Sequence, residues 1–165
     1  MKAKVIQMVD VMFVVVSLFG IMFFIGYVQP LAIAPIKDFE TTENTVLFSI
    51  EKADKILIDI NQEFENPREF LVKDGLEIEL EPGEYYWKAI NSLGVESEVN
   101  KFTIISKIDL RLKEFSNGYE VVNAGNTRLN VDVYNGMEKI DSFRLGINES
   151  KKSGGIKFFG WWNDE

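Results

Sequence analysis

The feature that most constrains this chain is an uncharged apolar run near its N-terminus, Val11–Val28, which reads VMFVVVSLFGIMFFIGYV. Its 18 residues form a helix about 27 Å long at 1.5 Å per residue, close to the thickness of a membrane's hydrocarbon core. The run is apolar on every side, whereas a helix of a soluble core keeps a polar stripe. We therefore expect residues 11–29 to form a transmembrane helix that ends at Gln29 and Pro30.

Two other interpretations of this run stay open at the level of sequence. A cleaved signal peptide has an apolar region of roughly 7–15 residues, shorter than this one. Ala32-Ile33-Ala34 resembles a cleavage site, but Pro35 follows it directly and obstructs a peptidase. A buried core helix is the second alternative. A pilin-like subunit that assembles through its N-terminal helix is a variant of the anchor, although the basic-glycine junction of pilin leaders is missing.

The charges on either side of the run predict its orientation. Lys2 and Lys4 precede it, whereas the first 40 residues after it carry more acidic than basic side chains. Because basic residues stay on the cytoplasmic side, we expect residues 1–10 in the cytoplasm and the bulk of the chain outside. The prediction is a single-pass protein of the cell membrane, with residues 30–35 as a juxtamembrane linker.

The rest of the chain is strongly acidic. The whole sequence carries a net charge of −8, and removing the first 28 residues (two Lys and one Asp) leaves 16 basic and 25 acidic residues, a net charge of −9. Such a body repels phosphate backbones, and no Lys/Arg cluster interrupts it. We therefore expect no nucleic-acid partner, and we attribute the acidity mainly to solubility.

Several kinds of chemistry are excluded by composition. The chain has no cysteine and no histidine, which excludes disulfides, thiolate metal sites, cysteine nucleophiles and histidine-based acid–base catalysis. Glu77, Glu79 and Glu81 lie on one face of one predicted strand, so they cannot surround a calcium ion. The acidic segment 59–65 is interpreted as a polar loop. We predict no catalytic residue, no metal site and no cofactor.

Between residues 36 and 105 the apolar residues alternate with a period of two, which is typical of strands with one buried face. This pattern covers residues 45–50, 55–60 and 76–81. The positions predicted to face inward are Val46, Phe48, Ile50, Ile56, Ile58, Ile60, Leu76, Ile78 and Leu80. The fold class predicted for the chain is therefore all-β after an N-terminal helix, with antiparallel strands in one or two small sandwiches.

Residues 80–94 read Leu-Glu-Pro-Gly-Glu-Tyr-Tyr-Trp-Lys-Ala-Ile-Asn-Ser-Leu-Gly. This segment resembles the E–F corner and F strand of fibronectin type III and related Ig-like sandwiches, with a Leu-x-Pro-Gly turn, a tyrosine and alternating apolar residues. The resemblance implies a sandwich over about residues 36–105, with Pro82, Gly83 and Tyr85 in a tyrosine corner. The alternation predicts that Tyr85, Trp87 and Ala89 face inward, and that Tyr86, Lys88 and Ile90 face outward. The resemblance concerns the fold and says nothing about function.

Residues 106–165 form a second predicted β region. Alternation places Ile108, Leu110 and Leu112, and again Leu129, Val131 and Val133, on single faces. The run from Val121 to Val131 resembles the strand–turn–strand of cell-surface Ig-like modules. Asn135-Gly136 predicts a type I′ hairpin turn, residues 140–145 a strand and residues 150–155 a loop. Because Ser106-Lys107 is the only connector, this second small domain abuts the first, and one shared core or two separate cores both stay open.

The end of the chain is rich in aromatic residues. Phe158, Phe159, Trp161 and Trp162, together with Tyr86, are a candidate interaction surface if they are exposed. The alternative is a last strand that buries its aromatics in the second core. Asn148-Glu149-Ser150 is a glycosylation sequon, so Asn148 is a candidate site of modification.

These features together predict a non-enzymatic, membrane-anchored protein that interacts with other proteins or supports assembly at the cell envelope. The expected partners are the membrane itself and other envelope proteins. One alternative is glycan binding through exposed Tyr86, Trp161 and Trp162, which requires two coplanar exposed rings. The other alternative is the pilin-like subunit.

Overall fold

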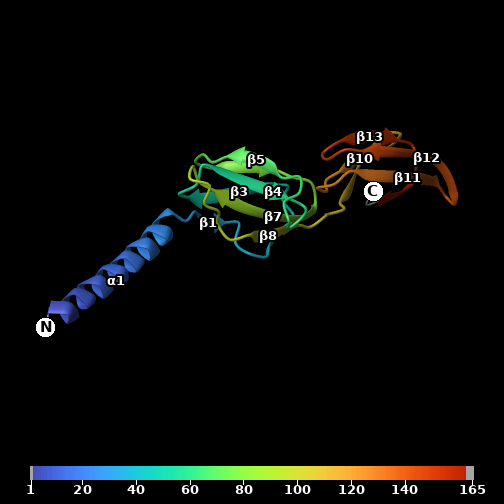
Figure 1. The fold of residues 1–165 in the computed structure, drawn as a ribbon. Helices are drawn as coiled ribbons and strands as arrows, with labels where there is room; N and C mark the ends of the chain where they lie inside the picture. Colours follow the sequence, from blue (N-terminus) through green and yellow to red (C-terminus); the bar gives the residue numbers. More distant parts are fainter. Residues whose placement is uncertain (1, 163–165) are drawn as a thin grey trace. The chain divides into compact units, whose positions relative to one another are not determined.

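The structure is a computed structural model that describes residues 2–162, with side chains described for residues 7–24 and 28–162. It confirms the predicted fold class, because a single N-terminal helix precedes a chain of strands arranged in several sheets, most of them antiparallel. Figure 1 shows this order, from the blue helix to the red C-terminal strands. A β-sandwich has the same strand-rich, multi-sheet composition.

Helix α1 spans Lys2–Val28 and includes the predicted membrane segment. Every described side chain from Gln7 to Phe24 is exposed, and this stretch is long and apolar enough to cross a membrane. The alternative of a buried core helix therefore does not hold. A membrane anchor and a signal sequence both have this length and apolar composition. The helix ends before Pro30, because proline restricts the residue that precedes it to extended conformations.

The chain forms two compact units. The first comprises residues 1–35, 48–76 and 86–100, and the second comprises residues 36–47, 77–85 and 101–165. The strands β3 (Thr45–Glu51), β6 (Leu76–Glu79), β7 (Gly83–Ile90) and β8 (Asn100–Ile104) contribute residues to both units. The predicted boundary between residues 105 and 106 stays a prediction.

In the first unit, β4 (Lys55–Asp59) lies between β5 (Arg68–Leu71) and β7, and both pairings are antiparallel. Strand β1 (Leu31–Ala34) pairs with β3. The core residues of this unit include Phe48 and Trp87, whose rings meet edge to face with their centroids 5.1 Å apart. Trp87 and Ala89 are fully buried, as their alternation predicted.

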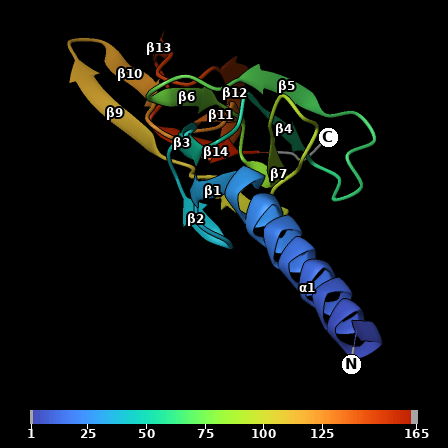
Figure 2. The same ribbon diagram turned by 60° about the vertical axis from the view of Figure 1, so that its left-hand side comes forward.

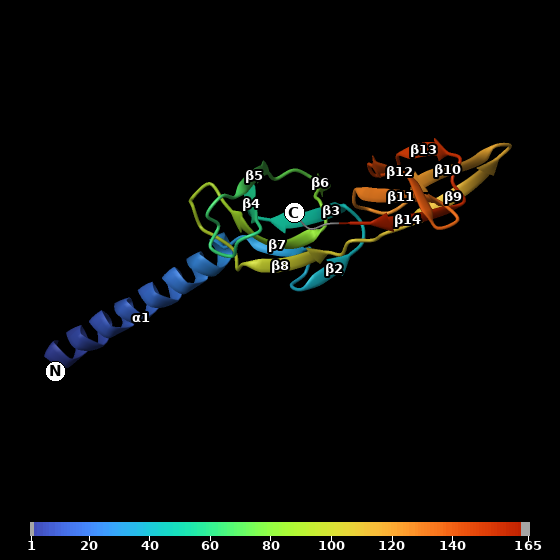
Figure 3. The ribbon, with the colours of Figure 1, turned by 90° about the vertical axis from the view of Figure 1, so that its right-hand side faces the viewer.

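In the second unit, β2 (Phe39–Thr41) runs parallel to β8 (Asn100–Ile104), and Figure 3 shows these two strands together. The 31–105 region, which has strands of both units, contains two sheets with the strand orders β1-β3-β6 and β2-β8-β7-β4-β5. Phe102 and Ile104 of β8 are buried, as are Val46, Ile78 and Leu80.

The second unit also contains two three-stranded sheets built from residues 110–161. One has the order β13-β10-β9 and the other the order β12-β11-β14. Figure 2 shows β9 and β10 side by side as a hairpin. The strands are β9 (Leu110–Phe115), β10 (Gly118–Asn123), β11 (Leu129–Asn135), β12 (Glu138–Leu145), β13 (Ser150–Ser153) and β14 (Lys157–Trp161). Their shared core consists of Val121, Leu129, Val131, Val133 and Leu145.

One residue predicted to face inward is exposed, and so are two apolar residues of the alternating row at 108–112. Ile60 is 75% exposed, because β4 ends at Asp59, whose carboxylate accepts hydrogen bonds from the backbone N–H groups of Asn61 and Asn66 and turns the chain. Ile108 precedes β9 and is exposed, and Leu112 within β9 is also exposed. Of Ile108, Leu110 and Leu112, Leu110 packs against the core. Alternation in the sequence shows which side chains share a face of a strand, but it does not show how much of that face another sheet covers.

Two local predictions are also corrected. Residues 150–153 form β13 rather than a loop, because their backbone N–H and C=O groups pair with β10. Lysine residues such as those of this segment are common in exposed edge strands. The β11–β12 hairpin closes with Asn135 opposite Glu138, so Gly136 and Met137 form the turn. Only Gly136 of these two has a positive φ, whereas a type I′ turn needs both.

Candidate binding face

Strand β14 divides the predicted aromatic surface between two sides of its sheet. Phe158 and Trp162 are partly buried and pack against the core of residues 121–145. Phe159 and Trp161 point the other way, with 48% and 41% of their surface exposed. Two of the four C-terminal aromatic residues are therefore exposed and two pack on the core, because successive side chains of a strand point to opposite sides.

The register of the sheet brings further residues beside the two exposed aromatics. On β11, Asn130 lies opposite Trp161, Asp132 opposite Phe159 and Tyr134 opposite Lys157. On β12, the same three β11 residues lie opposite Arg144, Ser142 and Lys139. We call these nine outward residues the aromatic face: Asn130, Asp132, Tyr134, Lys139, Ser142, Arg144, Lys157, Phe159 and Trp161.

Asp132 is the centre of the hydrogen bonds on the aromatic face. Its carboxylate accepts from Lys139 Nζ and from Ser142 Oγ, each at 2.7 Å. The Lys139 bond is the main cause that lowers the pKa of Asp132 below its usual 3.8, followed by the Ser142 bond, and a bond from Trp161 adds to it. Asp132 therefore stays ionised at neutral pH, where it keeps its ion pair with Lys139.

The aromatic rings of the face contact each other and a cation. Phe159 meets Tyr134 edge to face, with ring centroids 5.5 Å apart and an angle of 85° between the planes. The Lys157 ammonium lies 4.7 Å from the centroid of the Phe159 ring. Arg144 Nε donates to Asn130 Oδ1 at 3.3 Å in the neighbouring row. The face is thus a connected set of rings and polar groups rather than a set of independent side chains.

The charge of the aromatic face is opposite to that of the chain. Three cations, Lys139, Arg144 and Lys157, accompany one carboxylate, Asp132, which gives the face a net charge of +2. The whole chain carries −8. A local positive field on an acidic protein favours a partner that presents carboxylates or other anionic groups.

The remaining residues predicted as sites lie elsewhere in the fold. Tyr86 is a partly buried residue of β7, opposite Asp59 of β4, in the first unit. Asn148 is exposed, has a φ of 58° and donates its backbone N–H to the carbonyl of Asn123 at 3.0 Å. Its glycosylation stays a prediction.

The residues of the predicted tyrosine corner lie at the start of β7. The hydroxyl of Tyr85 donates to the carbonyl of Glu81 at 2.8 Å, and its buried ring stacks on Phe102 with centroids 5.4 Å apart. Gly83 lies against the Tyr85 ring, where a Cβ atom would be in ordinary contact with it. This arrangement ties the turn after Pro82 to the strand that follows.

Sequence reasoning missed seven of the nine residues of the aromatic face. The alternation of Asn130, Asp132 and Tyr134 with buried neighbours was readable, and it gives their outward direction. What the sequence lacked was the pairing of β11 with both β12 and β14, which depends on long-range register. Among residues 2–162, no group of His, Cys, Asp and Glu has the arrangement of a metal site.

No protein-family model matches the chain, and no curated protein is similar to it by sequence. The description of the fold therefore rests on the structure alone.

Proposed function

We propose that this chain is a non-enzymatic, membrane-anchored protein of the cell envelope that binds another protein through the aromatic face. The observation that carries the proposal is the exposed pair Phe159 and Trp161 within a positively charged face on an acidic chain. Aromatic residues and arginine are the residue types enriched at protein interfaces. The acidic remainder of the chain restricts nonspecific contact, whereas the face attracts an acidic partner.

The anchor and the fold family are parts of the same proposal. Helix α1 has the length and composition of a membrane span, and Lys2 and Lys4 favour a cytoplasmic N-terminus. The Tyr85 hydroxyl bond to Glu81 supports a fibronectin type III-like or Ig-like sandwich for the 36–105 region. In this arrangement the aromatic face lies outside the cytoplasm, where it meets other envelope proteins.

The ring geometry favours a protein partner over a glycan. Sugar binding by stacking needs exposed, coplanar ring faces, but Phe159 is perpendicular to Tyr134 and lies beside the Lys157 ammonium. Trp161 and Trp162 point to opposite sides of β14, so they form no common platform. Carboxylate-bearing side chains of a protein match the cations of the face.

The test is a crosslinking capture from intact membranes with the full-length chain. The test variant reverses two charges of the face, Arg144→Glu and Lys157→Glu. The matched control reverses one arginine and one lysine of β9, Arg111→Glu and Lys113→Glu, which lie on a different sheet. We expect the native chain and the control to capture the same protein, and the test variant to lose at least about 90% of it.

Three results discriminate the alternatives. Loss of capture in the test variant alone supports the proposal. Equal capture by both variants shows that the aromatic face is not the binding site. A captured species that resists protease but disappears after polysaccharide digestion would instead establish the glycan alternative.

A further inference from the structure

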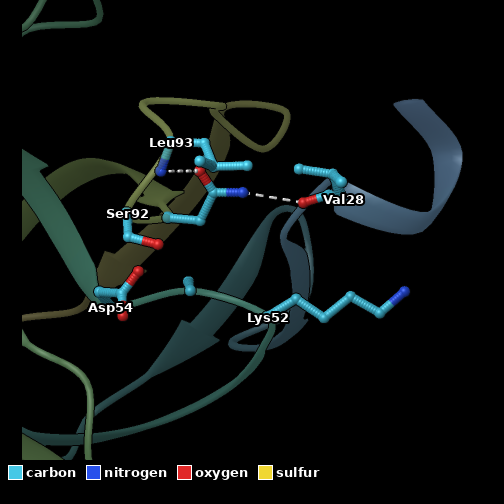
Figure 4. Close-up of a pocket in the computed structure, with 7 residues that line it drawn as sticks. Val28, Lys52, Asp54, Ser92 and Leu93 are labelled. Atoms are coloured by element: carbon cyan, nitrogen blue, oxygen red, sulfur yellow. Dashed lines mark hydrogen bonds between the residues drawn. The ribbon is translucent and has the colours of Figure 1, made fainter. Parts of the chain in front are cut away.

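The end of helix α1 is tied to a turn of the first unit by one side chain. Asn91 Nδ2 donates to the carbonyl of Val28 at 2.9 Å. The last carbonyls of a helix have no partner within it, so this bond satisfies one of them. Asn91 Oδ1 in turn accepts from the backbone N–H groups of Leu93 and Val95, each at 3.0 Å. Figure 4 shows Val28 at the helix end and Ser92 and Leu93 in the turn that follows β7.

A shallow hollow lies beside this contact. It has a volume of about 390 Å³ and is lined by the helix end and two turns, with the residues Val28, Lys52, Ala53, Asp54, Asn91, Ser92 and Leu93. Leu93 is 69% exposed, and Lys52, Asp54 and Ser92 are exposed as well. Figure 4 shows the Lys52 side chain extending toward the side of the view on which α1 lies.

We propose that the two turns, residues 52–54 and 92–94, form a membrane seat that binds the headgroup of a phospholipid in the bilayer crossed by α1. This inference rests on the proposed anchor. If residues 11–28 span the hydrocarbon core, Val28 lies at its outer boundary. The bond from Asn91 then places the 92–94 turn at the level of the headgroups, and residues 52–54 line the same hollow as the helix end.

The chemistry of the seat matches a zwitterionic phospholipid. Lys52 supplies an ammonium on a long apolar stem, which suits a phosphate at the interface. Asp54 supplies a carboxylate for the amine of the same headgroup, and the Ser92 hydroxyl is a further hydrogen-bonding group. Leu93 adds an exposed apolar side chain, whose transfer into the interfacial region is favourable. The lining pairs one cation, Lys52, with one carboxylate, Asp54, which matches a headgroup that carries one charge of each sign.

The test uses single-cysteine variants of the full-length chain, since the native sequence has no cysteine. Each variant is reconstituted in nanodiscs of phosphatidylcholine and phosphatidylethanolamine and labelled with an environment-sensitive fluorophore. The seat is probed by Leu93→Cys and the anchor by Val16→Cys. The control is Ile60→Cys, whose residue is 75% exposed in the same unit but follows the opposite end of β4 from Asp54. Quenching by aqueous iodide and by headgroup-proximal spin-labelled lipid is then measured.

We expect the label at position 93 to be quenched by the lipid at least about 3-fold more, and by iodide at least about 3-fold less, than the label at position 60. Adding Lys52→Glu to the Leu93→Cys variant should reduce the lipid quenching, whereas adding Lys113→Glu should not. Protection at position 16 with equal accessibility at positions 93 and 60 would overturn the membrane seat while the anchor stands. Iodide access at position 16 would overturn the anchor and the seat together.

Discussion

The side-chain amide of Asn126 donates to the backbone carbonyl of Thr42 at 2.7 Å, across 84 residues of sequence. The same Nδ2 group donates to Ile105 at 2.9 Å, and Oδ1 accepts from the N–H of Lys107 at 2.6 Å. Asn44 Nδ2 donates to the Asn126 carbonyl at 2.9 Å. One nearly buried asparagine thereby joins the segment before β3, the connector at residues 105–107 and the turn before β11, all within the second unit.

Replacing this asparagine should destabilise the chain. Asn126→Ala leaves three backbone groups without their partners, and we expect a loss of about 2–4 kcal/mol in the free energy of unfolding. The measurement is urea denaturation followed by tryptophan fluorescence. Asn135→Ala, at an exposed position of the hairpin, should change stability by less than about 0.5 kcal/mol. Equal stability of the two variants would show that the Asn126 bonds contribute nothing net.

Asn123 is a second buried asparagine, and we expect that replacing it with a charged residue destabilises the chain strongly. Asn123 is fully buried, and its Nδ2 group faces the carbonyls of Thr127, Leu145 and Gly146. Asn123→Asp keeps the shape but places carboxylate oxygens against three acceptors, so we expect a loss of at least about 3 kcal/mol. Thermal unfolding at pH 7 checks this, with the half-buried Asn130→Asp as the comparison. A melting temperature close to that of the native chain would contradict the prediction.

Gly125 should be required because the backbone of Lys107 approaches it closely. A Cβ atom at Gly125 would collide with the carbonyl oxygen of Lys107, which is backbone and cannot move aside cheaply. We therefore expect Gly125→Ala to cost about 1–3 kcal/mol. Gly154→Ala is the matched control, because a Cβ atom there meets nothing within 4 Å. Denaturant midpoints of the two variants that coincide would rule this explanation out.

The hydroxyl of Tyr85 should contribute a modest, separable stability term. Tyr85→Phe removes the 2.8 Å bond to the Glu81 carbonyl but keeps the ring that stacks on Phe102. We expect a loss of about 1 kcal/mol. Tyr119→Phe provides the comparison, since Tyr119 makes a ring contact with Phe158 that the change preserves. A larger loss at Tyr119 than at Tyr85 would argue against a special role for the corner hydroxyl.

The aromatic face should respond to acid through Asp132. Because folding lowers the pKa of Asp132 below 3.8, its contribution to stability is present above that value and is lost as the pH falls below it. Solvent screening keeps the effect small. The stability difference between the native chain and Asp132→Asn should therefore shrink between pH 5 and pH 3. Denaturation at these two pH values measures it, and a difference that grows toward pH 3 would contradict the assignment.

Much of the fold was accessible from local patterns. An uncharged run of 18 residues predicted the helix, and the alternation of Tyr85, Trp87 and Ala89 predicted which side chains are buried. These predictions succeeded because the burial of one face of a strand, or of a whole helix in a membrane, produces a local pattern of apolar residues in the sequence. The exposed Ile60 and Leu112 show the limit, since an apolar residue is compatible with a buried face without proving one.

Composition and local patterns were enough to predict the apolar helix and the all-β class and to exclude cysteine and histidine chemistry. The pairing of distant strands was needed to show that Lys151 and Lys152 lie in a strand, that Asn126 joins three distant segments, and that Phe159 and Trp161 lie opposite Asp132 and Asn130 of β11. Each of these depends on which strands pair and in which register. Pairing is set by the packing of the whole chain, and a one-residue shift of β14 would turn Phe159 and Trp161 to the opposite side of the sheet.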